Sequence, residues 1–209
     1  MNANEFLYSY LNNASPTGFE ASGQKIWLDY IQPFIDEKII DTYGTAVGVI
    51  NPGQPYKVVI EAHADEISWF VNYIDDNGYL FLRRNGGSDA LIAPSMRANI
   101  HTKDKVVKGI FGWPAIHVRT DKNPETKPDT VFIDVGCSTK EEVEKLISVG
   151  DPITRERSLV EMGDCVNSKS LDNRVAVFIL IEALKRLKGK NIPYDFYAVF
   201  TVQEEVGIR

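Results

Sequence analysis

The chain has 209 residues, 44% of them hydrophobic and 25% charged, which is the composition of an ordinary soluble globular protein. Its net charge of -6 argues against nucleic acid as the main partner, because phosphate binding needs a basic surface. Two cysteines imply no disulfide framework, no apolar run is long enough for a membrane helix, and the N-terminus lacks the features of a signal peptide. We therefore expect a cytoplasmic protein.

The first part of the chain predicts two helices followed by short strands. Apolar residues recur at helical spacing between residues 6 and 11 and between residues 26 and 34. Strands are expected at 38–42, 46–50 and 57–62. The last of these runs is apolar on both faces, which is typical of a central strand covered by helices. This order favours a layered α/β fold.

The middle of the chain is rich in short β segments. They are expected at 67–74, 79–84, 105–112 and 130–135, with one helix at 139–148 opened by a capping box of Ser138 and Glu141. From Gly163 onward the α/β pattern returns, with an apolar helix at 174–188 and a buried strand at 195–202. We predict an α/β domain of residues 1–67 and 164–209, interrupted by a small β-barrel or sandwich domain of residues 68–163.

Polar residues follow the third strand, at an edge where ligands bind in open α/β sheets. Residues two apart in an extended segment share a side, so His63 and Asp65 are expected to point the same way. His63 could then bind a metal ion while Asp65 orients its ring. The plainer interpretation is a buried histidine hydrogen-bonded to an acid.

Two further polar clusters lie at similar places. Asp172 stands at the start of the apolar helix, where it could cap the helix or bridge two metal ions through its two oxygens. Glu204 and Glu205 follow the last strand. Adjacent residues in a strand face opposite sides, so we expect one of them to bind a metal ion and the other to reach a metal-bound water. Solvated loop carboxylates are the plainer interpretation.

The order of these clusters and their amino-acid sequences closely resemble those of one family. The segments EAHADEI, SLDNR and TVQEEVG, with SPTGFE near the start, are similar to metallopeptidase family 42, the glutamyl and deblocking aminopeptidases of the co-catalytic zinc exopeptidase clan. The resemblance runs over the whole chain. It implies a zinc-exopeptidase-like mixed sheet flanked by helices, an inserted β-barrel domain that serves oligomerisation, and a tetrahedral dodecamer.

The resemblance also implies roles for individual residues. His63 binds one metal ion, Glu205 binds the other, and Asp172 bridges them; Glu204 is the general base and Asp65 orients the histidine. Two divalent ions, zinc or cobalt, would activate a water that removes N-terminal residues from peptide substrates. Related enzymes have a cis peptide after the bridging aspartate, here between Asp172 and Asn173.

Two more ligands in the family, an aspartate and a histidine, come from segments beyond the Glu-Glu strand. The chain is therefore expected to be truncated before them and to hold two metal ions poorly. His101 and His117 lie in the inserted domain and are interpreted as structural.

The sequence leaves two other functions open. Glu204 and Glu205 could be the carboxyl pair of a glycosidase, although sequence neighbours on a strand diverge and glycosidase carboxyls face each other across a sugar. The chain could instead be an assembly or binding module that acts through its β domain.

Overall fold

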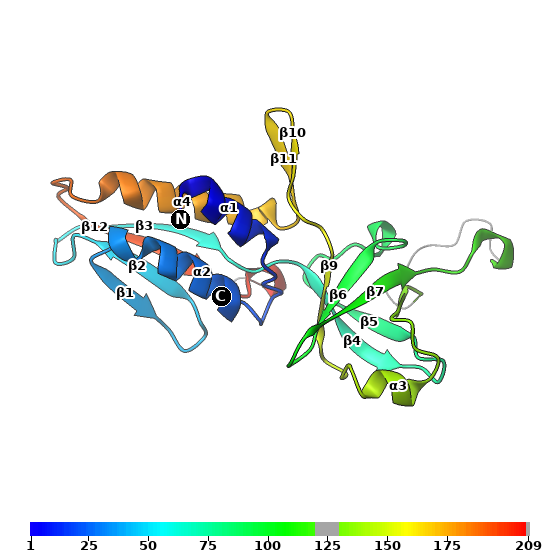
Figure 1. The fold of residues 1–209 in the computed structure, drawn as a ribbon. Helices are drawn as coiled ribbons and strands as arrows, with labels where there is room; N and C mark the ends of the chain where they lie inside the picture. Colours follow the sequence, from blue (N-terminus) through cyan, green and yellow to red (C-terminus); the bar gives the residue numbers. More distant parts are fainter. Residues whose placement is uncertain (120–129, 208–209) are drawn as a thin grey trace. The chain divides into compact units, whose positions relative to one another are not determined.

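A computed structural model of the protein describes residues 1–119 and 130–207 (Figure 1). The chain divides into two compact units: an α/β unit of Met1–Glu66 with Ser158–Arg209, and a β unit of Ile67–Arg157. The sequence predicted the second boundary at residue 163, later than the structure has it. Residues 158–163 contain the first strand of a short hairpin, and the Leu159 amide donates to the side chain of Asn12 in the α/β unit.

The α/β unit contains a four-stranded sheet in the order β1-β2-β12-β3. Its strands are β1 (Glu37–Ile40), β2 (Ala46–Ile50), β3 (Lys57–His63) and β12 (Asp195–Thr201). The sheet is mixed, since β12 runs parallel to β3 and antiparallel to β2. A separate hairpin is formed by β10 (Val160–Met162) and β11 (Cys165–Asn167).

Helices pack on this sheet and complete the predicted α/β architecture. They are α1 (Ala3–Asn12), α2 (Ala21–Ile31) and α4 (Leu171–Leu187), with 3-10 turns η1 (Gln32–Phe34) and η4 (Glu204–Val206). In Figure 1, α1 and α4 lie side by side over the sheet. Within the described residues, no helix is long and apolar enough to cross a membrane.

The core of the α/β unit forms because alternate residues of β12 point toward the helices. Phe196, Ala198 and Phe200 are buried there, and the Phe200 ring lies 3.9 Å from the Trp27 ring of α2, centroid to centroid. Gly48 in β2 is required by close packing, because a Cβ there would lie 2.9 Å from the Ile35 side chain and 3.0 Å from that of Ile31 in α2. The sheet and α2 can therefore approach closely.

The parallel pairing of β3 and β12 brings two polar clusters together. Thr201 is paired with His63, and the Ala64 amide donates to the Thr201 carbonyl at 2.9 Å. Carboxyl ends of parallel strands meet at one edge of a sheet, so the residues after β3 and those after β12 are neighbours.

The prediction that the Val-Val-Ile-Glu-Ala run is a central strand was wrong for the part of the chain that the structure describes. There β3 is an edge strand, and Val59 and Ile60 are 60% and 47% exposed. These exposures also show that the described residues do not cover the faces of β3 over its whole length, as the expected helices would. Apolar residues on both faces of a strand predict only that the faces are covered. They carry no information on how many neighbours pair with it.

The β unit is a closed barrel in the order β4-β5-β8-β7-β6-β9, as the strand spacing predicted. The strands are β4 (Ser68–Ile74), β5 (Leu80–Asn85), β6 (Arg97–His101), β7 (Val106–Gly112), β8 (Phe132–Asp134) and β9 (Pro152–Arg155). Short helical segments are η2 (Ala90–Ile92), η3 (Ile116–Val118) and α3 (Lys140–Glu144). The cap of α3 is Thr139, which accepts from the Glu142 amide, and not Ser138 as predicted.

The barrel gives a matched test of this fold. Ile100 is fully buried, whereas Ile110 on the neighbouring strand is 55% exposed. We expect Ile100→Ala to lower the free energy of unfolding by about 2–5 kcal/mol, because it leaves a cavity. Ile110→Ala should cost under about 1 kcal/mol. Urea unfolding of both variants measures this. Equal losses would show that the outer face of β7 is buried in the protein.

Candidate active site

The end of β3 carries a histidine held by the acid two residues later. His63 is 7% exposed and Asp65 is fully buried. The Nδ1 atom of His63 lies 3.2 Å from Oδ1 of Asp65, so the two side chains point the same way, as their spacing predicted. This contact fixes the orientation of the ring and leaves Nε2 as the nitrogen that faces the rest of the site.

Asp65 also holds two other segments in place. Its Oδ2 accepts from Thr17 Oγ1 at 2.8 Å, and its two oxygens accept from the backbone amides of Glu204 and Glu205 at 3.1 and 3.2 Å. Burial alone would raise the pKa of Asp65, but these hydrogen bonds and the one with His63 outweigh it and hold the pKa below its usual value. Asp65 is therefore an ionised carboxylate at neutral pH.

Asp172 faces the other nitrogen of the histidine ring. Its Oδ1 lies 3.2 Å from Nε2 of His63, and its side chain is 88% exposed. Asp172 is not a helix cap: Ser170 occupies that position, and Asp172 has non-helical dihedrals (φ -81°, ψ 114°) within the first turn. The peptide between Asp172 and Asn173 is cis, as the family resemblance implied.

Glu204 and Glu205 lie in the turn η4 and not in a strand, so the prediction that they face opposite sides of an extended segment does not apply. Gln203 has a left-handed conformation (φ 60°) that ends the strand, and both following amides then point at Asp65. Oε2 of Glu204 lies 3.8 Å from Nε2 of His63, and this side chain is 46% exposed. The pKa of Glu205 is raised, by burial first and then by the nearby Asp65, Asp172 and Glu204 in spite of His63.

Negative charge dominates this group of side chains. Burial would lower the pKa of His63, but the hydrogen bond and charge of Asp65, with the carboxylates of Glu204 and Asp172, raise it to about 9. One cationic histidine therefore faces several carboxylates. Such an arrangement favours a bound cation.

The donor set fits a divalent metal in part. Two ligand atoms of a tetrahedral zinc, each about 2.0–2.1 Å from the ion, are roughly 3.3 Å apart. The 3.2 Å between His63 Nε2 and Asp172 Oδ1 matches that separation, and Asp65 on the other ring nitrogen is the usual partner of a metal-binding histidine. In the part of the chain that the structure describes, no three His, Cys, Asp or Glu side chains are already arranged to hold a metal ion.

The remaining histidines lie elsewhere. His101 in the barrel contacts Thr154 Oγ1 through Nε2 at 2.8 Å, in keeping with a structural role. His117 lies in the turn η3 of the same unit.

Sequence reasoning missed three residues that support the site. Thr17 binds Asp65, Glu20 accepts from the Gln203 amide at 3.1 Å, and Glu66 is buried one residue after Asp65. Burial raises the pKa of Glu20 despite its backbone hydrogen bonds. The sequence held a signal for Thr17 and Glu20, which belong to the segment Ser-Pro-Thr-Gly-Phe-Glu. A simple break between two helices does not need several polar residues.

The hydroxyl of Thr17 gives a test of this support. Thr17→Val removes the donor to the buried carboxylate of Asp65, and we expect a loss of about 1.5–3 kcal/mol in the free energy of unfolding. Thr17→Ser keeps the hydroxyl and should cost only one buried methyl group, roughly 1 kcal/mol. Urea unfolding compares them. A larger loss in the serine variant would show that the methyl group, and not the hydrogen bond, matters.

Comparison with known proteins identifies the family of the chain. The family model described as M42 glutamyl aminopeptidase matches residues 44–209. The lysyl aminopeptidase of Pyrococcus furiosus is 29% identical over 215 aligned residues, which cover 98% of this chain and 60% of that protein.

Solved structures agree with this assignment. The TET aminopeptidase of a marine sediment archaeon of the Thaumarchaeota superposes with a TM-score of 0.94 at 28% identity, over 98% of this chain and 60% of the other. The TET1 peptidase of Pyrococcus horikoshii, described as assembling into a tetrahedron or a large octahedral shell, has a TM-score of 0.88 at 27% identity, over 99% and 62%. The chain thus spans about 60% of the length of these relatives. It belongs to the M42 glutamyl aminopeptidase family.

Proposed function

We propose that the protein is a metal-dependent aminopeptidase that removes N-terminal residues from peptides. His63, Asp172 and Glu205 would hold two divalent ions, zinc or cobalt. Glu204 is the general base and Asp65 orients His63. The observation that carries this proposal is the position of the His63 ring, with Asp65 on one nitrogen and Asp172 on the other, both at 3.2 Å.

The tautomer of His63 follows from its contacts. An ionised Asp65 accepts a hydrogen bond from Nδ1, so a neutral ring carries its proton there and keeps the Nε2 lone pair for a cation. The buried carboxylate thereby selects the form of the ring that can act as a ligand.

Glu204 is suited to move protons. Its carboxylate is about half exposed and lies 3.8 Å from Nε2 of His63, close enough to accept a hydrogen bond from a water beside that nitrogen. Bound divalent ions would lower the pKa of that water and polarise the scissile carbonyl. Glu204 takes the proton of the attacking water and passes it to the leaving amine.

We further propose that the protein acts in the cytoplasm as a homo-oligomer, a dodecamer by family resemblance, with the β-barrel unit contributing to assembly. The description of the Pyrococcus horikoshii relative as a tetrahedral or octahedral assembly supports association. Neither nucleic acid nor a membrane is proposed as a partner, in keeping with the net charge of -6.

Metal dependence tests the proposed function. The native-length protein, loaded with zinc or cobalt, should cleave aminoacyl-nitroanilides and peptides with a free N-terminus and leave N-acetylated peptides intact. EDTA should abolish the activity, and added metal should restore it. Activity on glycosides that survives the chelator would support the glycosidase alternative and exclude the peptidase.

Mutation of the paired glutamates tests their separate roles. Glu204→Gln should keep its metal and lower kcat by about 10²–10⁴-fold, because a general base is lost. Glu205→Gln removes a charged ligand, so it should lower metal content, and excess zinc should restore part of the activity. Activity assays with metal analysis by mass spectrometry measure both.

Glu61→Gln is the matched control, because Glu61 is an exposed residue of β3. It should leave metal content and activity unchanged. Loss of metal in the Glu204 variant together with a fully loaded but inactive Glu205 variant would reverse the two assignments.

A further inference from the structure

The position of Asp172 does not come from packing of its own side chain. That side chain is 88% exposed and contacts His63 by a single 3.2 Å approach. The backbone around it is irregular: Ser170 is left-handed (φ 60°, ψ 26°), and Asp172 and Asn173 have non-helical dihedrals. A non-glycine residue with positive φ persists where surrounding contacts enforce it. The carboxylate of Asp172 is therefore aimed by whatever holds this turn.

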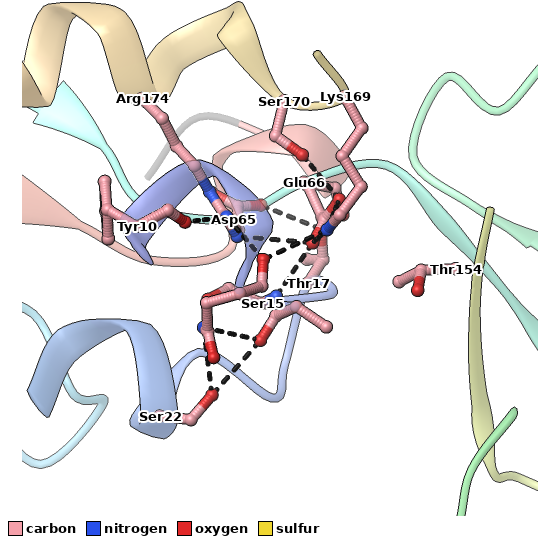
Figure 2. A network of polar contacts seen from close by, with 12 residues as sticks. Tyr10, Ser15, Thr17, Ser22, Asp65, Glu66, Thr154, Lys169, Ser170 and Arg174 are labelled. Atoms are coloured by element: carbon pink, nitrogen blue, oxygen red, sulfur yellow. Dashed lines mark hydrogen bonds and ion pairs between the residues drawn. The ribbon is translucent and has the colours of Figure 1, made fainter. Parts of the chain in front are cut away.

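The turn is held from both sides by one buried carboxylate, that of Glu66 (Figure 2). Before Asp172, Lys169 Nζ donates to both Glu66 oxygens at 2.6 and 2.7 Å, and Ser170 Oγ donates to Oε2. After Asp172, Arg174 donates through a terminal nitrogen to Oε1 at 3.2 Å. The three donors flank Asp172 in sequence and converge on one acceptor.

Glu66 is itself fixed relative to His63. It lies three residues after His63, the last residue of β3. Its amide donates to the Ser15 carbonyl at 3.0 Å, and its carbonyl accepts from the Thr17 amide at 3.2 Å. The Ser15 amide also donates to Oε1 at 2.8 Å. The carboxylate thus connects the end of the strand that carries His63 with the turn that carries Asp172.

The cluster is buried, so its contacts exclude water. Glu66 is 3% exposed, Lys169 8% and Arg174 0%. Arg174 also donates to the carbonyls of Tyr10 and Asn13 at 2.7 and 2.6 Å, at the C-terminal end of α1 where carbonyls attract cations. Without Glu66, two cations would remain buried with no compensating carboxylate in the cluster.

Burial would raise the pKa of Glu66, but Arg174 and Lys169 outweigh it and lower the pKa to about 2. A lowered pKa means that the stabilisation from this carboxylate is complete above its unfolded value, near pH 4.5, and is lost as the pH falls toward 2. At the neutral pH of a metal titration the Glu66 carboxyl is ionised.

We propose that Glu66 is a positioning residue for the metal centre, which through Lys169, Ser170 and Arg174 holds the Asp172 carboxylate opposite His63. This rests on the proposed function, in which Asp172 is a metal ligand. Glu66 touches neither metal nor substrate, and it sets the separation of two ligands that come from segments far apart in the sequence.

Cobalt titration of the native-length protein, followed by visible absorption, tests this. Glu66→Gln keeps the size of the side chain but loses its charge. It should weaken cobalt binding by about 10–100-fold, which is the usual effect of losing a group that orients a metal ligand. It should also change the absorption bands of bound cobalt. Ser170→Ala removes one donor without leaving a buried charge, and should weaken cobalt binding by a smaller factor. Glu61→Gln, in the strand β3 that ends at His63, should bind cobalt as the wild type does.

The outcomes separate a positioning role from a structural one. A folded Glu66→Gln protein that melts earlier but binds cobalt with wild-type affinity and spectrum overturns the inference. If Glu66→Gln does not fold, Ser170→Ala decides, and unchanged affinity and spectrum there overturn it. Wild-type protein that binds no cobalt overturns the proposed metal centre and this inference with it, whereas equal binding by wild type and Glu66→Gln overturns the inference alone.

Discussion

Two adjacent buried carboxylates, Asp65 and Glu66, are the interaction on which the rest of the site depends. Asp65 accepts from the backbone of Glu204 and Glu205, and Glu66 accepts from the residues around Asp172. Burying two neighbouring carboxylates away from water would cost much free energy if they had no hydrogen-bond or ion-pair partners. Their partners lower the pKa of both, so each is ionised and fully engaged.

These carboxylates enforce two backbone turns that the chain would not favour by itself. Ser170 and Gln203 both have φ 60° without being glycine, and each precedes a candidate active-site residue by one or two positions. Ser170 donates to Glu66, and the amides after Gln203 donate to Asp65. Stability and function are therefore coupled here: the hydrogen bonds that satisfy the buried charges also aim Asp172 and Glu204.

The sequence could predict features that depend on the local spacing of residues and strands. The spacing of His63 and Asp65 correctly placed their side chains together, and strand spacing indicated the barrel. Strands β6 and β9 were missed because each has few apolar residues. β9 pairs with β6 across more than 50 positions of sequence, and β6 also pairs with β7. The turns at Ser170 and Gln203 were equally hidden, since no glycine marks them and their hydrogen-bond partners are more than 100 residues away.

The two sides of the candidate centre are held in different ways, and this bears on how it would take up a cation. His63 and Asp65 are buried and fixed to the end of β3, whereas the side chains of Asp172 and Glu204 are 88% and 46% exposed. The exposed carboxylates lose little on reorienting their side chains, but their backbones are tied to buried charges. Affinity for a cation would then be set less by the ligands' own packing than by Asp65 and Glu66. Substitutions at these two buried residues should change the centre more than their distance from the ion suggests.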